Sequence, residues 1–200
     1  MPTIFSHAIV ATAAGQWLSP RANPPRLRSR GADSRIANPG PFWFWTIVCA
    51  MLPDIDVIGF SFGIQYGDMF GHRGFTHSLF FAALIGLVAA DALTRSASKA
   101  NSLGVGGWQL GVGALWAWFA AVTMSHGVLD AMTNGGRGIA FFAPFSNHRY
   151  FFPWRPIQVS PIGAGFFSAR GLSVLVSEAR WIWLPSAIIA VSARVFRRPT

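Results

Sequence analysis

Apolar residues dominate five stretches of the chain, and polar residues gather in short clusters at or between their ends. The pattern predicts hydrophobic helices over residues 3–18, 42–52, 78–93, 105–124 and 180–195. The helix over 105–124 is the best candidate to span a membrane, and His126 and Asp130 extend it. We therefore expect an all-α fold, an integral membrane bundle of about five hydrophobic helices in a single domain over residues 1–200.

The connections differ in character. Residues 19–41 contain five Pro and five Arg without hydrophobic periodicity and are expected to form a loop. Pro53 is expected to interrupt the second helix, which is too short to span alone before apolar residues resume over 57–62. Residues 63–75 form a Gly-rich connection, and residues 95–101 a polar turn. A long loop over 131–179 precedes the last helix.

Composition supports the membrane assignment. The chain is 52% hydrophobic and 12% charged, against roughly 25% charged in a typical soluble domain, and its mean hydropathy is +0.41. Nine Trp suit the wet edges of a bilayer. The net charge of +9 comes mostly from loop Arg, so we expect no nucleic acid partner. A single cysteine, Cys49, excludes a disulfide framework and is expected to be a small apolar residue.

The polar clusters lie at matching ends of successive helices. His7 is near the start of the first helix, and Asp54 and Asp56 follow the second. The segment His72-Arg73-Gly74-Phe75-Thr76-His77-Ser78 precedes the third, and His126 and Asp130 end the fourth. Because neighbouring helices alternate in direction, all of these residues are expected at one face. No Lys or Arg precedes Arg21, so a signal peptide is not indicated and we expect the mature protein to keep His7.

Basic residues suggest an orientation. Ten Lys and Arg fall on the opposite face and six on the face with the polar clusters. Cytoplasmic loops carry the excess of basic residues, so the site is expected on the periplasmic side of the inner membrane.

The residue types in these clusters favour a divalent metal. His126 and Asp130 are four residues apart and share one helix face, although a hydrogen bond between them is the alternative interpretation. Asp54 and Asp56 would be costly carboxylates at membrane depth, and such groups usually serve a function. Imidazole and carboxylate are ligands that zinc prefers. We predict one or two ions, zinc before other metals, held by His7, Asp54, His72, His77, His126 and Asp130.

The predicted chemistry is hydrolysis by metal-activated water. Asp54 and Asp56 are the candidates to take the proton, and His77 is either a ligand or an acid at the helix start. Arg73 is the candidate contact for a substrate anion. Thr76 and Ser78 are expected to cap the third helix. His148 is expected to be a loop residue without a role.

Together these motifs resemble the YdjM family of bacterial membrane-bound metal-dependent hydrolases, over His7 to about Pro153. The His-Arg-Gly-x-Thr-His-Ser element is the most specific of them. The resemblance implies a more distant similarity to zinc-dependent phospholipase C and the S1/P1 nucleases, and through it ligand roles for His126, Asp130, His72, Asp54 and His7. Those relatives have further His and Glu ligands downstream, whereas this chain offers only His148 and Glu178 there, outside a matching motif.

We therefore expect a multi-pass inner membrane enzyme that cleaves phosphoester bonds of lipid, lipid-linked or periplasmic substrates, with the bilayer as its partner. The alternative is a non-catalytic membrane protein in which the metal is structural or serves transport.

Overall fold

The computed structural model describes residues 1–18, 40–99, 111–161 and 163–196. Within these residues the protein is helical and has no β-strand, only two isolated bridges in the loops, so the predicted all-α class is confirmed. Four helical segments are long and apolar enough to cross a membrane: Gly40–Phe62, Leu79–Ser96, Val112–Ala131 and Ala169–Phe196. A shorter apolar helix, α1 (Ile4–Gly15), accompanies them.

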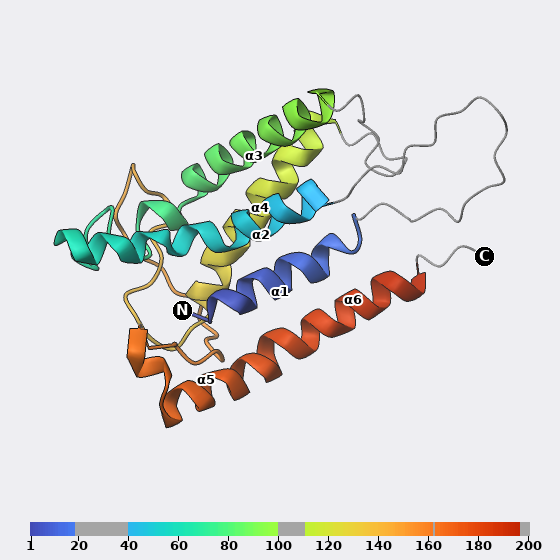
Figure 1. The fold of residues 1–200 in the computed structure, drawn as a ribbon. Coiled ribbons are helices and arrows are strands. Elements are labelled where there is room, and N and C mark those ends of the chain that lie inside the picture. The colour runs from blue at the N-terminus through green and yellow to red at the C-terminus, as the bar shows by residue number, and fades with distance from the viewer. Residues whose placement is uncertain (19–39, 100–110, 162, 197–200) are drawn as a thin grey trace, which may run out of the picture.

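The helices lie side by side in a bundle (Figure 1). Helices α3 (Leu79–Lys99) and α4 (Val112–Ala131) form a long antiparallel pair that packs on α2 (Gly40–Met51). Helix α1 lies between α2 and α6 (Leu184–Phe196). The loop over residues 132–161 covers one end of the bundle, where α1 begins and α4 ends.

The α-helix ends just before Pro53, as predicted, but the helical path is not broken there. The chain continues from α2 directly into η1 (Leu52–Phe62), a 3₁₀ helix that follows α2 in the same direction. Proline has no backbone N–H to donate to the carbonyl four residues earlier, so the α-helical hydrogen bonds cannot continue. The backbone tightens to the three-residue repeat of a 3₁₀ helix instead of turning away. One segment of 23 residues results, which is long enough to span.

Two other helices are longer than predicted. Helix α3 continues to Lys99 where a turn at residue 95 was expected, and Arg95 forms an ion pair with Asp91 one turn earlier. The last helix begins at Ala169 rather than 180. It runs through α5 (Ala169–Glu178) and the π-helical η4 (Ala179–Trp183) into α6, and η3 (Gly163–Phe166) precedes it. Polar residues on one side of a helix do not end it when the opposite side is apolar.

Other predicted boundaries fall partly outside the described residues. The loop over 19–41 lies outside them except for its last two residues, which open α2, where Pro41 is tolerated in the first turn. The predicted start of the fourth helix at residue 105 also lies outside them, and the described helix begins at Val112.

Small residues let α3 and α4 pack closely. A Cβ atom on Gly86 would lie 2.7 Å from the backbone nitrogen of Ala120, so only glycine fits at this crossing. The core between the helices is built mostly from small and aromatic residues. Cys49 is fully buried there, which confirms its predicted role as a small core residue.

Candidate metal centre

Four separate elements bring seven polar side chains together at one end of the bundle. Helix α1 carries His7, η1 carries Asp54 and Asp56, and α4 carries His126 and Asp130. The segment between η1 and α3, which includes η2 (Phe75–His77), carries His72 and His77. All seven are at least nine-tenths buried. The convergence expected from alternating helix directions is present.

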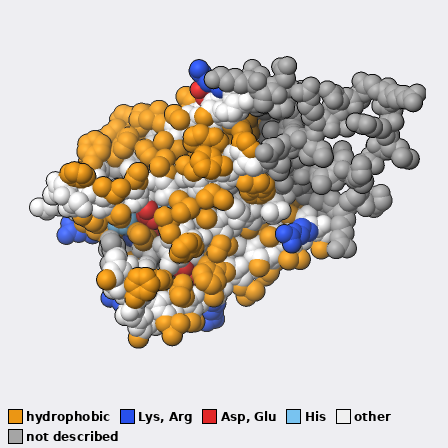
Figure 2. Space-filling view, viewed as in Figure 1, with side chains coloured by type: hydrophobic (Ala, Val, Ile, Leu, Met, Phe, Trp, Pro, Cys, Tyr) orange, Lys and Arg blue, Asp and Glu red, His pale blue; other side chains and the backbone are white. Residues whose placement is uncertain are grey.

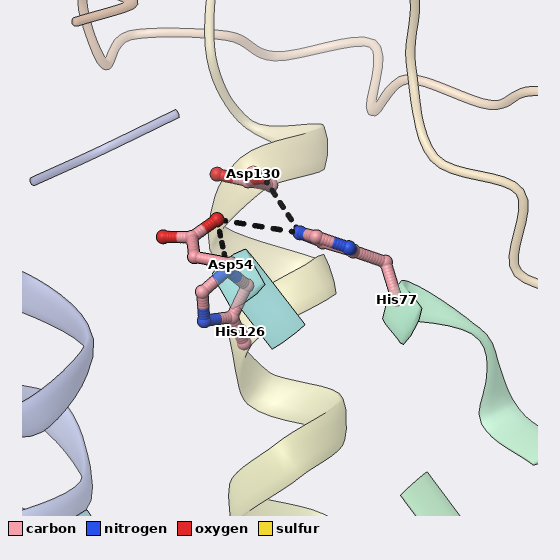
Figure 3. A group of neighbouring side chains, drawn as sticks. All are labelled: Asp54, His77, His126 and Asp130. Carbon is pink, nitrogen blue, oxygen red and sulfur yellow. Dashed lines mark hydrogen bonds and ion pairs between the residues drawn. The ribbon is translucent and has the colours of Figure 1, made fainter. Parts of the chain in front are cut away.

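Asp54, His77, His126 and Asp130 form the inner cluster (Figure 3). One ligand atom from each lies within 4.8 Å of the others. Oδ1 of Asp54 is 3.2 Å from Nε2 of His126 and 3.7 Å from Nε2 of His77. Oδ2 of Asp130 is 3.4 Å from the same nitrogen of His77. The four groups therefore point their nitrogen and oxygen atoms at a shared centre.

The backbone of α2 sets the orientation of His126. Its Nδ1 lies 2.7 Å from the carbonyl oxygen of Ala50, which can only accept a hydrogen bond. Nδ1 therefore carries the proton, and the neutral ring presents the lone pair of Nε2 to the cluster. The alternative expected from sequence, a hydrogen bond between His126 and Asp130, is not the contact that His126 makes.

Asp56 orients His77 in the same way. Its Oδ2 lies 3.2 Å from Nδ1 of His77 and also accepts hydrogen bonds from the hydroxyl of Thr76 and the backbone N–H of Arg73. Its Oδ1 lies 2.7 Å from Nδ1 of His72. A carboxylate behind an imidazole fixes the ring and leaves the far nitrogen free to bind a metal. Asp56, His72 and His77 also form a second group with metal-ligand spacing.

The two predicted helix caps have different roles. The hydroxyl of Ser78 accepts the backbone N–H of Phe81 at 3.0 Å, so Ser78 caps α3 as predicted. Thr76 does not cap the helix, because its hydroxyl donates to Asp56 at 2.6 Å. Thr76 is two residues further from the helix, too far to reach the orphan N–H groups.

Arg73 is fully buried, and its guanidinium lies against protein groups. Its Nε lies 3.1 Å from Oδ2 of Asp130, and its two terminal nitrogens donate to the carbonyl of Gly135 and the hydroxyl of Thr133. Its backbone has φ 64, in the left-handed region that a bulky residue rarely adopts. Strain of this kind persists where surrounding contacts enforce it, and such contacts cluster at functional sites. In the structure its guanidinium contacts protein groups of the site.

Glycines make this tight segment possible. A Cβ on Gly74 would lie 2.2 Å from the carbonyl oxygen of Met69, and one on Gly71 would lie 2.0 Å from that of Gln65. The backbone therefore folds tightly on both sides of Arg73. This tight fold holds the neighbouring histidines in place. This explains in physical terms why Gly follows His-Arg in the motif.

His7 stacks on His126 with ring centroids 3.5 Å apart and an interplanar angle of 9°. Its Nε2 lies 3.9 Å from Oδ1 of Asp130, and neither ring nitrogen has a hydrogen bond partner among the residues that the structure describes. His7 thus borders the inner cluster as a further nitrogen donor.

The unpaired atoms of this site test whether a metal ion fits. Among the described residues, nearly all buried side-chain polar atoms without a hydrogen bond belong here: both nitrogens of His7, Oδ2 of Asp54, Nε of Arg73, Nε2 of His77 and both oxygens of Asp130. Buried polar atoms rarely lack partners in native proteins. Three carboxylates against one guanidinium leave two negative charges, which a divalent cation would balance. Two imidazoles and two carboxylates are a donor set that zinc accepts.

Without such an ion, His77 supplies part of the missing charge. Burial alone lowers the pKa of His77, but the carboxylates of Asp130, Asp54 and Asp56 beside the ring outweigh burial and hold the pKa well above its ordinary value.

Glu178, the only glutamate in the chain, braces α1 against α5. Its buried carboxylate accepts hydrogen bonds from the backbone N–H and hydroxyl of Thr3 and from the hydroxyl of Ser6, next to His7. Ser6 in turn accepts Nε1–H of Trp183 at 2.7 Å. The sequence could have indicated this contact, because an acidic residue within an apolar stretch usually has a hydrogen bond or ion pair partner. His148, by contrast, is exposed and meets the ring of Tyr150 edge-on, as expected of a loop residue.

Comparison with known proteins identifies the family. The profile described as "YdjM inner membrane protein" matches residues 1–199. The chain belongs to the YdjM family. This YdjM-family chain is similar to the inner membrane protein YbcI of Escherichia coli K12. The two are 35% identical over 190 residues, which cover 94% of this chain and 95% of the relative. No solved structure matches.

Membership in the YdjM family confirms the resemblance drawn from the motifs and the expected inner membrane location. The helices that can span a bilayer agree with it. The more distant similarity to phospholipase C and the S1/P1 nucleases stays a prediction, as do the hydrolase activity, the identity of the metal and the face of the membrane that holds the site.

Proposed function

We propose that this YdjM-family protein is a membrane-bound metal-dependent hydrolase that cleaves phosphoester bonds. The observation that carries the proposal is the inner cluster, where one nitrogen or oxygen atom from each of Asp54, His77, His126 and Asp130 lies within 4.8 Å of the others. Family membership supports the location, and the donor chemistry supports zinc.

In this proposal the four residues of the inner cluster hold the ion. Asp56 and the carbonyl of Ala50 orient the imidazoles of His77 and His126 from behind. A second ion, if bound, would use the group of Asp56, His72 and His77. His7 lies beside Asp130 as a further donor.

The bound metal would supply a nucleophile by lowering the pKa of its water from 15.7 to about 7. Asp54 is suited to take the proton, because its Oδ2 has no hydrogen bond partner. The water oxygen would bond to phosphorus while the ester P–O bond breaks. The proton on Asp54 would pass to the leaving oxygen, so that an alcohol and a phosphate are released.

Arg73 is better suited to position Asp130 than to contact substrate, because all three of its guanidinium nitrogens face protein groups. Holding Asp130 in place keeps this carboxylate directed at the inner cluster. We also propose that the site faces the periplasm, for which the excess of basic residues on the opposite side is the support.

A non-catalytic metal site is the second candidate. It is favoured by the burial of all four inner donors, because four protein ligands and no open position are typical of structural zinc. In that case metal would raise stability and no ester would be cleaved.

Metal analysis of detergent-purified protein is the first test. We expect about one or two equivalents of zinc in the wild type and loss of stoichiometric metal in His126→Ala and Asp54→Ala. His148→Ala, an exposed histidine outside the site, is the control and should keep its metal. Wild-type protein without stoichiometric zinc, manganese or iron would refute the metal centre.

Hydrolysis assays separate the two candidates. Wild-type protein should cleave a generic phosphomonoester or phosphodiester, and a chelator or either ligand variant should abolish the activity. Activity that ignores chelator and both substitutions would exclude the mechanism. Metal-loaded protein without activity would leave the structural role.

A further inference from the structure

The depth of the site follows from helix lengths. An α-helix rises about 1.5 Å per residue and a 3₁₀ helix about 2.0 Å. If α2 starts at one boundary of the hydrocarbon layer, Asp54 and Asp56 lie roughly 22–28 Å along the span. On α4, His126 and Asp130 lie roughly 21–28 Å from its start. The layer is about 30 Å thick, so both spans place these residues just inside its far boundary.

The outer surface at this level is apolar. Ile55, between the two aspartates in sequence, is 52% exposed, and Phe5 on α1, two residues before His7, is also exposed. Leu79 and Phe80 at the start of α3 are exposed as well. Figure 2 shows small acidic and histidine patches between hydrophobic side chains on the face of Figure 1. The site is therefore bordered by side chains suited to acyl chains rather than to water.

Beyond the site, the loops carry aromatic and basic residues together. Phe145 and Phe167 are 84% and 89% exposed, far more than a water-soluble surface usually allows at clustered aromatic positions. The guanidinium of Arg155 lies 4.8 Å from the ring of Phe151, and that of Arg180 lies 4.9 Å from that of Trp181. Aromatic rings sit at headgroup level, and basic side chains there attract lipid phosphates.

We infer that the candidate site opens sideways into the lipid layer just below the headgroups, and that its substrate is a membrane lipid bearing a phosphate ester. The substrate part rests on the proposed function. Exposed apolar side chains lie along the spanning helices, at Ile55 beside the site and on the loops, so the bilayer that covers the helices also covers the border of the site. A lipid reaches such a border by lateral diffusion, with its phosphate at the level of the metal ligands.

Spin labels test the depth without any assay of activity. Cys49 is the only cysteine and is buried, so Cys49→Ala gives a background for single labels. Labels would be placed through Ile55→Cys and Phe145→Cys. Leu87→Cys, exposed midway along α3, is the lipid reference, and Gln65→Cys, in an exposed polar turn, is the aqueous reference.

In phosphatidylcholine–phosphatidylglycerol nanodiscs, the labels at positions 55 and 145 should collide with dissolved oxygen far more than with a water-soluble nickel chelate, as the label at position 87 does. Nickel accessibility at position 55 equal to that at position 65 would overturn the inference. This result is independent of whether the protein is an enzyme.

A substrate comparison then separates the inference from the proposed function. Metal-loaded protein should release phosphate at least about tenfold faster from phosphatidic acid in nanodiscs than from soluble para-nitrophenyl phosphate at equal concentration, which corresponds to about 1.4 kcal/mol in the barrier. Hydrolysis of the soluble ester alone would overturn the inference and leave the proposed function standing. Hydrolysis of neither would overturn the proposed function, and the substrate assignment with it.

Discussion

Nε of Arg73 lies 3.1 Å from Oδ2 of Asp130, and neither side chain is exposed to solvent. The pair joins the glycine-rich segment before α3 to the end of α4, two parts of the chain that each carry a histidine of the inner cluster. A buried ion pair of this kind costs desolvation to form, but losing one partner leaves a bare charge in the interior. The pair is therefore a sensitive point of the site.

Replacing Arg73 should be strongly destabilising. Arg73→Met leaves the carboxylate of Asp130 without its counter-charge, and we expect a loss of about 3–5 kcal/mol in the free energy of unfolding. Thermal unfolding in detergent, with chelator present, measures it. Arg95→Met is the matched control, because the pair with Asp91 is exposed, and it should cause no measurable change. A second substitution, Asp130→Asn, should restore part of the loss in Arg73→Met; a double variant less stable than the single one would contradict the pairing.

Asp56 should act on metal affinity through His77. Asp56→Asn keeps the shape of the side chain but weakens its hold on Nδ1 of His77, and we expect zinc affinity to fall about 10–100-fold. Competition with a chromogenic chelator measures the affinity. Asp68→Asn, which alters an exposed carboxylate at the same end of the bundle, should leave it unchanged. Unchanged affinity in Asp56→Asn would mean that His77 does not bind the ion.

Close packing at Gly86 should be required for the α3–α4 pair. The new methyl group of Gly86→Ala would press on the backbone of Ala120, and overpacking of this kind costs about 1–3 kcal/mol. Gly113→Ala is the control, because a Cβ there meets no atom within 4 Å and alanine favours the helix. Thermal unfolding should therefore separate the two variants in opposite directions. Equal unfolding temperatures would argue against the crossing.

The brace at Glu178 should contribute several kcal/mol. Glu178→Ala removes the acceptor for the N–H and hydroxyl of Thr3 and for the hydroxyl of Ser6. Hydrogen bonds to a charged group contribute about 1.5–3 kcal/mol each, so we expect a loss of at least about 3 kcal/mol in stability. Ser173→Ala, on the exposed side of the same helix, should unfold like the wild type. If both variants unfold alike, the hydrogen bonds to Glu178 do not stabilise the protein.

Hydrophobic pattern and helix alternation were sufficient to predict the bundle and the end at which Asp54, His77 and His126 meet. These features depend on chain direction and on the cost of polar groups in an apolar layer, which are visible in a single sequence. The spacing of His126 and Asp130 likewise predicted a shared helix face, and both side chains do reach the same cluster.

Local boundaries were predicted less well, because they depend on contacts. Pro53 removes one hydrogen bond, but packing against α4 and η2 keeps η1 helical and in line. Thr76 has the residue type of a cap, yet its hydroxyl donates to the carboxylate of Asp56, and Ser78 accepts the backbone N–H that caps α3. The brace between Thr3 and Glu178 joins residues 175 positions apart, and no local pattern encodes such a pair.

That separation has a consequence for biosynthesis. Chains emerge from the ribosome N-terminus first. The helix with His7 is thus made long before Glu178, the residue that fastens its first turn. Until the last helix enters the membrane, Thr3 and Ser6 lack the carboxylate that fixes them, so His7 is not yet held beside Asp130. If the proposed metal centre binds an ion, this order of synthesis favours binding during membrane insertion, before α6 packs on α1.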